Sequence, residues 1–451
     1  MDKAKTFGEL GIWQILTYST GYWTILLPAG ILIYLVLPIY SIALGVDAAL
    51  VGTLLALTRL WDAVTDPVMG IVTDNTRTRW GRRRPYLFAG AILSATFFAM
   101  IWFVPVSLTS FGKACYLFFM LILMYTGTTI FLVPYIALGN EISYNSDVRA
   151  RVIACRTALM AIPTLLFPWS YKLCFYLGRN EVEASRNMGL MIGLLMIVTG
   201  CLCAVFNKGN LATLRQEKLR FGESFKAAIT NRSFLMLMGI YVFTLASIVV
   251  VTPIFMCLII YYVCQGYREL GAKIIGIHGT IGAFIMFFLP VLIKFLNVKI
   301  NNKGLLYLAM GLWLLGVAIS WWVFNPNYPY ACLITSFFIS VLYPISCLVS
   351  YLILADICDD DSVKNKTKRE GIYSSMFGFI EKASFTIAIA AGSWMVTLSG
   401  IRPGTDAIQT PEALVKLKIL FATTSLPAIL MALILTVLYP IVKKNLLEPV
   451  A

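Results

Sequence analysis

The chain has 451 residues, of which 59% are hydrophobic and only 13% are charged. Soluble globular domains carry about 25% charged residues, so the composition excludes an ordinary water-soluble protein. Apolar runs of about 20 residues recur along the chain, which is typical of an all-α integral membrane protein. The net charge of +14 is concentrated in loops between these runs. Because membrane topology places basic residues in that way, the charge does not indicate nucleic-acid binding.

Twelve apolar runs predict twelve transmembrane helices in two six-helix bundles. Those of the first half lie at 13–44, 50–72, 86–106, 115–138, 152–177 and 188–206, and those of the second at 234–263, 272–296, 305–324, 329–354, 372–398 and 414–442. A basic segment at 207–232 separates them, and within it 221–231 fits a short amphipathic surface helix. We therefore expect an N-terminal bundle at 1–206, a linker at 207–232 and a C-terminal bundle at 233–451.

Lysines and arginines gather in alternate loops, which predicts the orientation in the membrane. By the positive-inside rule, both termini and the linker face the cytoplasm of a multi-pass protein in an inner or plasma membrane. The segment 1–9 is short and polar, and no cleavable secretory signal is expected. The ten cysteines show no paired metal spacing, and the single histidine, His278, is interpreted as a packing residue.

The stretch 59–85, RLWDAVTDPVMGIVTDNTRTRWGRRRP, carries two carboxylates inside an apolar run. Asp62 and Asp66 are four residues apart and so share one helix face. A charge within the bilayer costs several kcal/mol, so it indicates a function. Pro67 also leaves the carbonyl of Ala63 without its helical donor. These oxygens suit a small cation, and we predict a Na⁺ or H⁺ site here. The alternative is structural pairing of Asp62 with Arg59.

Further polar residues extend this prediction to a gate and a central cavity. Gly70 and Asp74, with Arg82, Arg83 and Arg84, predict a cytoplasmic gate formed by a close glycine crossing and a charge clamp. Basic residues within apolar runs need a polar cavity. The cavity is predicted to contain Arg156, Lys382, Tyr22, Trp23 and Tyr125. These aromatic rings suit either a sugar ring or simple packing.

An enzyme alternative rests on a second acidic patch. Asp62 and Asp66 together with Asp359–Asp361 are similar to the two aspartate-rich patches of membrane prenyltransferases. The number of spans disfavours that class, and the second patch is expected in a loop.

Three blocks of sequence resemble the glycoside–pentoside–hexuronide:cation symporters. They are VGTLLALTRLWDAVTDPVMGIVTDNTRTRWGRRRP at 51–85, VPYIALGNEISYNSDVRARVIACR at 133–156 and LADICDDDSVKNKTKREGIYSSMFGFIEKASF at 354–385. The resemblance implies the major facilitator fold and alternating access between two bundles. It implies a functional monomer in the bilayer that takes a sugar or glycoside with Na⁺ or H⁺ and needs no cofactor.

The same resemblance implies roles for particular residues. Asp62 and Asp66 match the cation-binding carboxylates of the family, and Thr65 and Thr129 match the polar side chains beside them. Arg156 and Lys382 match the basic residues of its central cavity.

Two departures from the family pattern concern the sugar. Sugar-binding members carry an acid in helix one, but 11–46 contains none, and Leu132 and Ile136 replace an acid and a tryptophan in helix four. Unpaired sugar hydroxyls are costly in a buried site. The animal sodium-dependent lysophospholipid transporters are similar in WDAVTDP and in the cavity lysine, and they also lack the helix-one acid. An amphipathic substrate is therefore the alternative to a sugar.

Overall fold

The computed structural model describes residues 10–142, 146–207, 230–296, 301–365, 370–404 and 407–439, and these residues form helices joined by short connections. In the first half the helices are α1 (Ile12–Gly21), α2 (Trp23–Val36), η1 (Leu37–Ala43), α3 (Ala48–Asn75), α4 (Arg84–Ile101), α5 (Ser110–Glu141), α6 (Ser146–Leu166), η2 (Phe167–Trp169), α7 (Ser170–Leu177) and α8 (Glu181–Phe206).

The second half repeats the pattern of long helices and broken helices. Its elements are α10 (Arg232–Val249), α11 (Val251–Cys257), η4 (Leu258–Val263), α12 (Arg268–Leu296), α13 (Asn302–Val323), η5 (Pro329–Cys332), α14 (Leu333–Ser340), α15 (Leu342–Asn365), α16 (Glu370–Leu398), α17 (Pro411–Thr423) and α18 (Leu426–Leu438).

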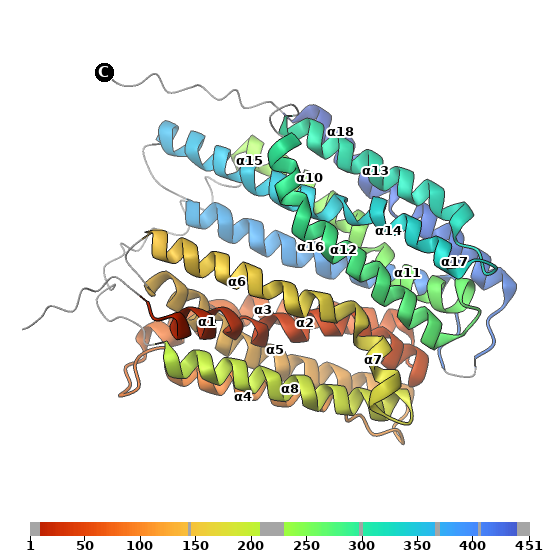
Figure 1. The fold of residues 1–451 in the computed structure, drawn as a ribbon, viewed down its shortest axis with the longest axis horizontal. Coiled ribbons are helices and arrows are strands. Elements are labelled where there is room, and N and C mark those ends of the chain that lie inside the picture. Colours follow the sequence, from red (N-terminus) through yellow and green to blue (C-terminus); the bar gives the residue numbers. More distant parts are fainter. Residues whose placement is uncertain are drawn as a thin grey trace, which may run out of the picture.

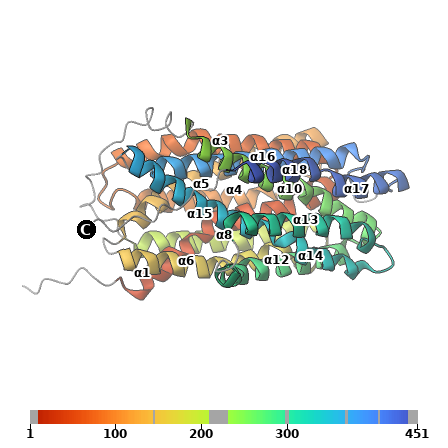
Figure 2. The ribbon, with the colours of Figure 1, turned by 90° about the horizontal axis from the view of Figure 1, so that it is seen from above.

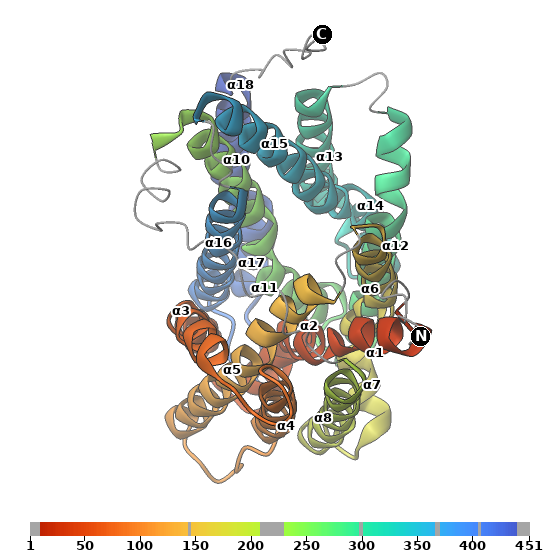
Figure 3. The ribbon, with the colours of Figure 1, turned by 90° about the vertical axis from the view of Figure 1, so that its left-hand side faces the viewer.

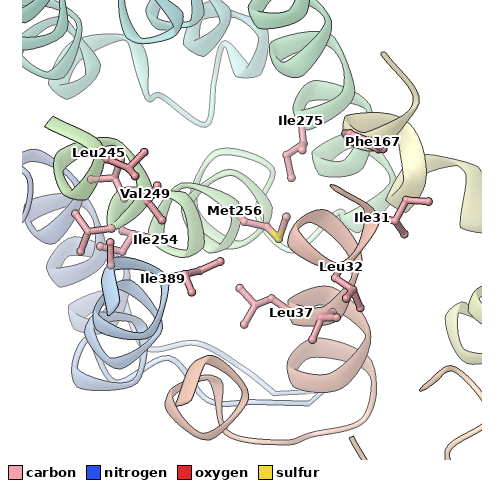
Figure 4. Packing of buried hydrophobic residues seen from close by; sticks show 14 of the residues in the cluster. Ile31, Leu32, Leu37, Phe167, Leu245, Val249, Ile254, Met256, Ile275 and Ile389 are labelled. Carbon is pink, nitrogen blue, oxygen red and sulfur yellow. The ribbon is translucent and has the colours of Figure 1, made fainter. Parts of the chain in front are cut away.

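The helices run lengthwise through the molecule and separate into two bundles (Figure 1). Viewed end-on, α1 to α8 form one group and α10 to α18 the other (Figure 3). Side chains from both groups meet in one apolar core. In Figure 4 the Met256 side chain extends from α11 toward the helix that carries Leu32 and Leu37. The larger of two apolar cores therefore holds the two bundles together, and the smaller one lies within the first bundle.

Eleven stretches of the described residues are long and apolar enough to cross a membrane. They correspond to every predicted run except 372–398, which is α16. This helix has 29 residues, but Glu381 and Lys382 lower its hydropathy. From above, α16 lies among the other lengthwise helices (Figure 2). We assign it as the twelfth span, since its length is sufficient.

The first span of each bundle ends in the same way, which suggests an internal repeat that relates the two bundles. Each finishes in a π-helix, η1 or η4, and a glycine with positive φ follows at Gly45 and Gly266. These glycines, with φ of 73° and 86°, adopt a conformation that side chains rarely tolerate. The predicted boundaries at 207–232 remain a prediction, because 208–229 lie outside the described residues. Most of the proposed 221–231 helix lies there too.

Several helices extend beyond the apolar runs that predicted them. The expectation of a loop at Asp359–Asp361 is wrong, because α15 continues to Asn365. In the same way α3 reaches Asn75 and α6 begins at Ser146. Hydropathy identifies only the lipid-facing part of a helix, whereas its ends can continue into water.

Candidate cation and substrate site

Asp66 lies at the centre of a polar cluster between α3 and α5. Thr129 of α5 donates a hydrogen bond from Oγ1 to Asp66 Oδ1 at 3.0 Å. The hydroxyls of Thr65 and Thr129 are 3.2 Å apart. Because α3 and α5 pack side by side in the first bundle, the four-residue spacing of Asp62 and Asp66 turns both toward this interface. We call Asp62, Thr65, Asp66 and Thr129 the carboxylate cluster.

Lys382 reaches the carboxylate cluster from the opposite bundle. Its Nζ lies 3.2 Å from Asp66 Oδ2, and the two side chains are 47% and 28% exposed. Both residues are near the middle of their helices, so solvent reaches the centre of the molecule. The structure thus joins α16 of the second bundle to α3 of the first by an ion pair.

Asp62 is the more buried carboxylate, with 6% of its surface exposed. Its Oδ2 lies 3.6 Å from Arg59, whose guanidinium stacks on the ring of Tyr125 at 4.6 Å. Its Oδ1 is buried and accepts no hydrogen bond from the described residues. A buried carboxylate oxygen without a donor is costly, and a small cation would satisfy it. The pairing with Arg59 leaves this second oxygen available.

The predicted cavity residues differ in their surroundings. Arg156 stacks on Tyr22, with its guanidinium carbon 5.1 Å from the ring centre, and its buried Nε has no acceptor among the described residues. Trp23 donates from Nε1 to the carbonyl of Leu159 at 3.1 Å. Tyr125 is only 3% exposed. Arg156 therefore retains an unused donor, whereas Tyr125 lies against Arg59 and is poorly accessible to a sugar.

Glu381 and Lys382 are adjacent in α16 but have different partners. Tyr241 of α10 donates a hydrogen bond to Glu381 Oε1 at 2.7 Å, within the second bundle. Lys382 instead points to the first bundle. Neighbouring residues on a helix project about 100° apart, as the two partners require.

Gly70 makes no close helix crossing in this structure, and the described hydrogen bonds of Arg84 stay within the first bundle. A Cβ placed on Gly70 would meet no atom within 4 Å, so no helix crosses closely there. Arg84 donates to the carbonyls of Val205 and Asn207, at the end of α8 in its own bundle. Arg82 and Arg83 also have partners. The Asp74 side chain lies outside the described residues, and the gate stays a prediction.

Close glycine contacts between the bundles occur instead at Gly52 and Gly279. A Cβ on Gly52 of α3 would lie 2.3 Å from Ser393 Cβ of α16. A Cβ on Gly279 of α12 would lie 2.1 Å from Pro168 Cγ of η2. We call these two helix contacts the seams. Both lie toward the end of the molecule at which α3 and α12 begin, which we call the far end.

Polar interactions reinforce both seams at the far end. Asp47, which caps α3, accepts a hydrogen bond from Thr397 of α16 at 3.1 Å. Across the other seam, Lys172 pairs with Glu269, and Arg268 pairs with Glu181 at 2.9 Å. The sequence contained no pattern that matched these partners to one another. The far end is thus held closed, while solvent reaches the carboxylate cluster.

A cavity of about 290 Å³ lies between the bundles. Residues from both bundles line it, and most are apolar, among them Phe167, Ile248, Phe255, Met256 and Ile275. We call it the apolar cavity. His278 contacts Phe255 with ring centres 4.5 Å apart, as its packing interpretation predicts. It also lines the cavity, and its buried Nε2 has no partner among the described residues.

Comparison with known families decides the class of the protein. The family model described as MFS/sugar transport protein matches residues 21–443. The chain belongs to this family. The fold agrees: a bacterial homologue of the lysosomal transporter Spinster, solved in an inward-facing and unoccupied conformation, superposes with a TM-score of 0.70 at 12% identity. That alignment covers 96% of this chain and 97% of the other.

Relatives in the MFS/sugar transport family span nearly the whole chain. A protein of Synechocystis sp. named as an uncharacterized symporter is 24% identical over 98% of this chain and 96% of its own. The glucuronide carrier protein homolog of Escherichia coli is 23% identical, covering 91% and 88%. The sodium-dependent lysophosphatidylcholine symporter 1-B of Danio rerio is 22% identical, covering 98% and 89%.

Membership of the MFS/sugar transport family confirms the predicted class. The protein is a multi-pass membrane transporter with the major facilitator fold. It is not an enzyme, so the prenyltransferase alternative is wrong. The resemblance to the glycoside–pentoside–hexuronide:cation symporters is also confirmed.

Proposed function

We propose that this protein is a secondary active symporter in which Na⁺ or H⁺ binds at the carboxylate cluster and drives uptake of a small organic solute. The observation that carries this proposal is the buried Oδ1 of Asp62, which accepts no hydrogen bond from the described residues. One helical turn away, Asp66 lies beside the hydroxyls of Thr65 and Thr129. Oxygen ligands of this kind suit a hard cation. The names of several relatives as symporters support the same reading.

Lys382 provides a physical link between cation binding and movement of the bundles. Its ammonium occupies one oxygen of Asp66 across the bundle interface. A cation that binds Asp66 competes with this ammonium and releases it from the carboxylate. A cation and a solute that bind one state more tightly than the other shift the equilibrium between states. Coupling would thus follow from competition for one carboxylate.

The arrangement of contacts supports alternating access. We propose that both termini face the cytoplasm, so that the closed far end faces outward and the carboxylate cluster is reached from the cytoplasm. In the other state, closure at Gly70 and the arginines 82–84 would complete the cycle. A single functional copy of the chain in the bilayer would suffice.

A glycoside or related sugar is the solute we propose first. The family description as sugar transport proteins and the relation to a glucuronide carrier favour it. The guanidinium of Arg156, whose buried Nε has no acceptor among the described residues, stacks on the ring of Tyr22, and this pair suits a hydroxyl or a uronate. The second candidate is a lysophospholipid or another amphiphile. The apolar cavity and the relation to a lysophosphatidylcholine symporter favour that one.

The decisive experiment compares the Asp66→Asn variant with the parent protein. It measures cation-dependent solute uptake into vesicles that contain each purified protein. Substitution removes a charged ligand, and we expect the response to a Na⁺ or H⁺ gradient to fall about tenfold to a hundredfold. Asp359→Asn is the matched control, because Asp359 is an exposed carboxylate on α15. An Asp66→Asn protein with normal folding and an undiminished response to both gradients would contradict the proposed site.

A further inference from the structure

The wall of the apolar cavity is mostly hydrocarbon, with few polar groups to pair with the hydroxyls of a sugar ring. Thr164 and Thr252 on its wall donate their hydroxyl hydrogens to the carbonyls four residues earlier, at 2.8 and 3.4 Å. The other hydroxyls of the wall belong to Tyr34, Ser340 and Tyr343. His278 Nε2 is the wall's buried nitrogen without a partner in the described chain. A sugar has several hydroxyls, and each one left unpaired costs free energy. Such a cavity favours hydrocarbon.

The size of the cavity fits an alkyl chain or an aromatic ring. Its volume of about 290 Å³ is roughly twice that of an engineered apolar cavity of about 150 Å³ that binds benzene. Empty apolar space of this size leaves the wall atoms without contacts. A ligand that supplied those contacts would be stabilised.

Two smaller cavities share wall residues with the apolar cavity and with each other. The first shares Thr252 and Met256 with the apolar cavity, and the second shares Leu32 and Leu55 with the first. Each has about 20 Å³, which is room for about one water molecule. The second is lined by Arg59, the partner of Asp62. The apolar cavity and the residues around the carboxylates are therefore neighbours, linked by shared wall residues.

Arg156 lies near enough to the apolar cavity for one solute molecule to contact both. Thr164 on the cavity wall follows Arg156 by eight residues on α6, which is about 12 Å along the helix. A molecule with a polar head at Arg156 and a short apolar group beyond it would span this distance. No single compact sugar would.

We propose that the apolar cavity binds an apolar alkyl or aryl group of the transported solute, so that the substrate is an amphiphile with a polar head at Arg156. This inference rests on the proposed symport function and narrows its substrate class. A hydrocarbon group of this kind is carried both by glycosides with an apolar aglycone and by lysophospholipids. The experiment distinguishes these sources.

The test measures binding to the purified full-length protein in lipid nanodiscs, with and without Na⁺. The probes are alkyl glucosides from methyl to octyl, phenyl glucuronide against glucuronate, and lysophosphatidylcholine against glycerophosphocholine. We expect affinity to rise about fourfold for each methylene that enters the cavity and then to level off. A gain confined to the glycosides identifies a glycoside substrate, and a gain confined to the lysolipid identifies a lipid.

Ala283→Phe tests the location, because Ala283 lines the cavity and a phenyl ring would fill it. We expect the gain from longer chains to disappear, while binding of methyl glucoside or glycerophosphocholine is retained. Ala89→Phe, at an exposed position on α4, is the matched control. If Ala283→Phe does not fold, Ala283→Val makes the same test, and we expect it to remove a smaller part of the affinity gained from longer chains.

Three results would overturn the inference. They are equal affinity for compounds with and without the apolar group, an unchanged chain-length series in the Ala283 variant, and no binding by any compound to correctly folded protein. Failure of the proposed symport function looks different. In that case the chain-length series persists but no ligand depends on a cation.

Discussion

At the scale of single residues, Lys382 is the side chain whose replacement separates binding from coupling. Lys382→Ala removes the ammonium that occupies Asp66, so a cation no longer competes with it. Solvent-exposed ion pairs contribute up to about 1 kcal/mol, and we expect Na⁺ to bind up to about fivefold more tightly. Solute uptake should nevertheless fall, because the link between the bundles is lost. Sodium titration of stability, together with uptake, measures both effects.

Lys273→Ala is the matched control for that variant, since Lys273 is an exposed lysine at the start of α12. Weaker sodium binding in Lys382→Ala would mean that the ammonium helps to form the cation site rather than competing with it.

The residues of the carboxylate cluster could be predicted because helical spacing decides which of them share a face. Asp62 and Asp66 follow this rule, and the resemblance to a symporter family pointed to Thr129 and Lys382. The partner of Glu381, by contrast, could not be predicted. Tyr241 is 140 residues away, and no local pattern reports a contact over that separation.

At the scale of helices, the two seams depend on glycines that permit close packing. Gly279→Ala would place a methyl group 2.1 Å from a rigid proline atom. Overpacking of this kind costs about 1–3 kcal/mol. We expect a loss of far-end closure and a slower uptake rate. Hydrogen exchange of α7 and of the start of α12 measures the closure, and vesicle uptake measures the rate.

Gly311→Ala serves as the control, because a Cβ there meets no atom within 4 Å. It should leave uptake intact and stabilise α13 by about 0.5–1 kcal/mol. Equal exchange of α7 in the Gly279 variant and the parent protein would contradict a role for this seam.

The charged pairs at the far end give a second prediction at this scale. Glu269→Gln removes the partner of Lys172 across the α7–α12 contact. We expect faster hydrogen exchange in α7 and a shift of the population away from the far-end-closed state. Glu412→Gln, on the first turn of α17, is the control. No change in α7 would show that the glycine contact alone keeps the seam closed.

The sequence showed which segments are helices but not which of their glycines meet the other bundle. We predicted a close helix crossing at Gly70, whereas the close glycine contacts between the bundles lie at Gly52 and Gly279. A glycine is equally small wherever it lies, so only the relative placement of two helices shows which one is needed. A crossing at Gly70 in the other state of the cycle remains a prediction.

At the scale of the whole molecule, hydropathy and loop charge were enough to predict twelve helices in two groups. Hydropathy works because lipid requires every span to satisfy its own backbone hydrogen bonds. It underestimated the ends of α3 and α15, which extend past the apolar part. The size and position of the apolar cavity could not be predicted, because they depend on how side chains from both bundles pack.

Coupling to a cation has a consequence for uptake by the whole carrier. One charge that moves through 100 mV supplies about 2.3 kcal/mol, which corresponds to nearly fifty-fold accumulation. With a neutral glycoside we therefore expect a membrane potential to increase uptake. With a singly anionic solute and one cation, the potential should have no effect. Vesicles with imposed potassium diffusion potentials measure this, and an unresponsive neutral solute would contradict net movement of a cation.

The ion pair between Asp66 and Lys382 also bears on how the transport cycle restarts. After release of its cargo, the carrier must return through an intermediate in which the middle of the protein is cut off from water. A bare carboxylate there would be costly. With the ammonium of Lys382 in place, the negative charge of Asp66 is already neutralised in that intermediate. We expect the reset step of the empty carrier to need no external ion, so that Lys382 governs turnover even when neither cargo is bound.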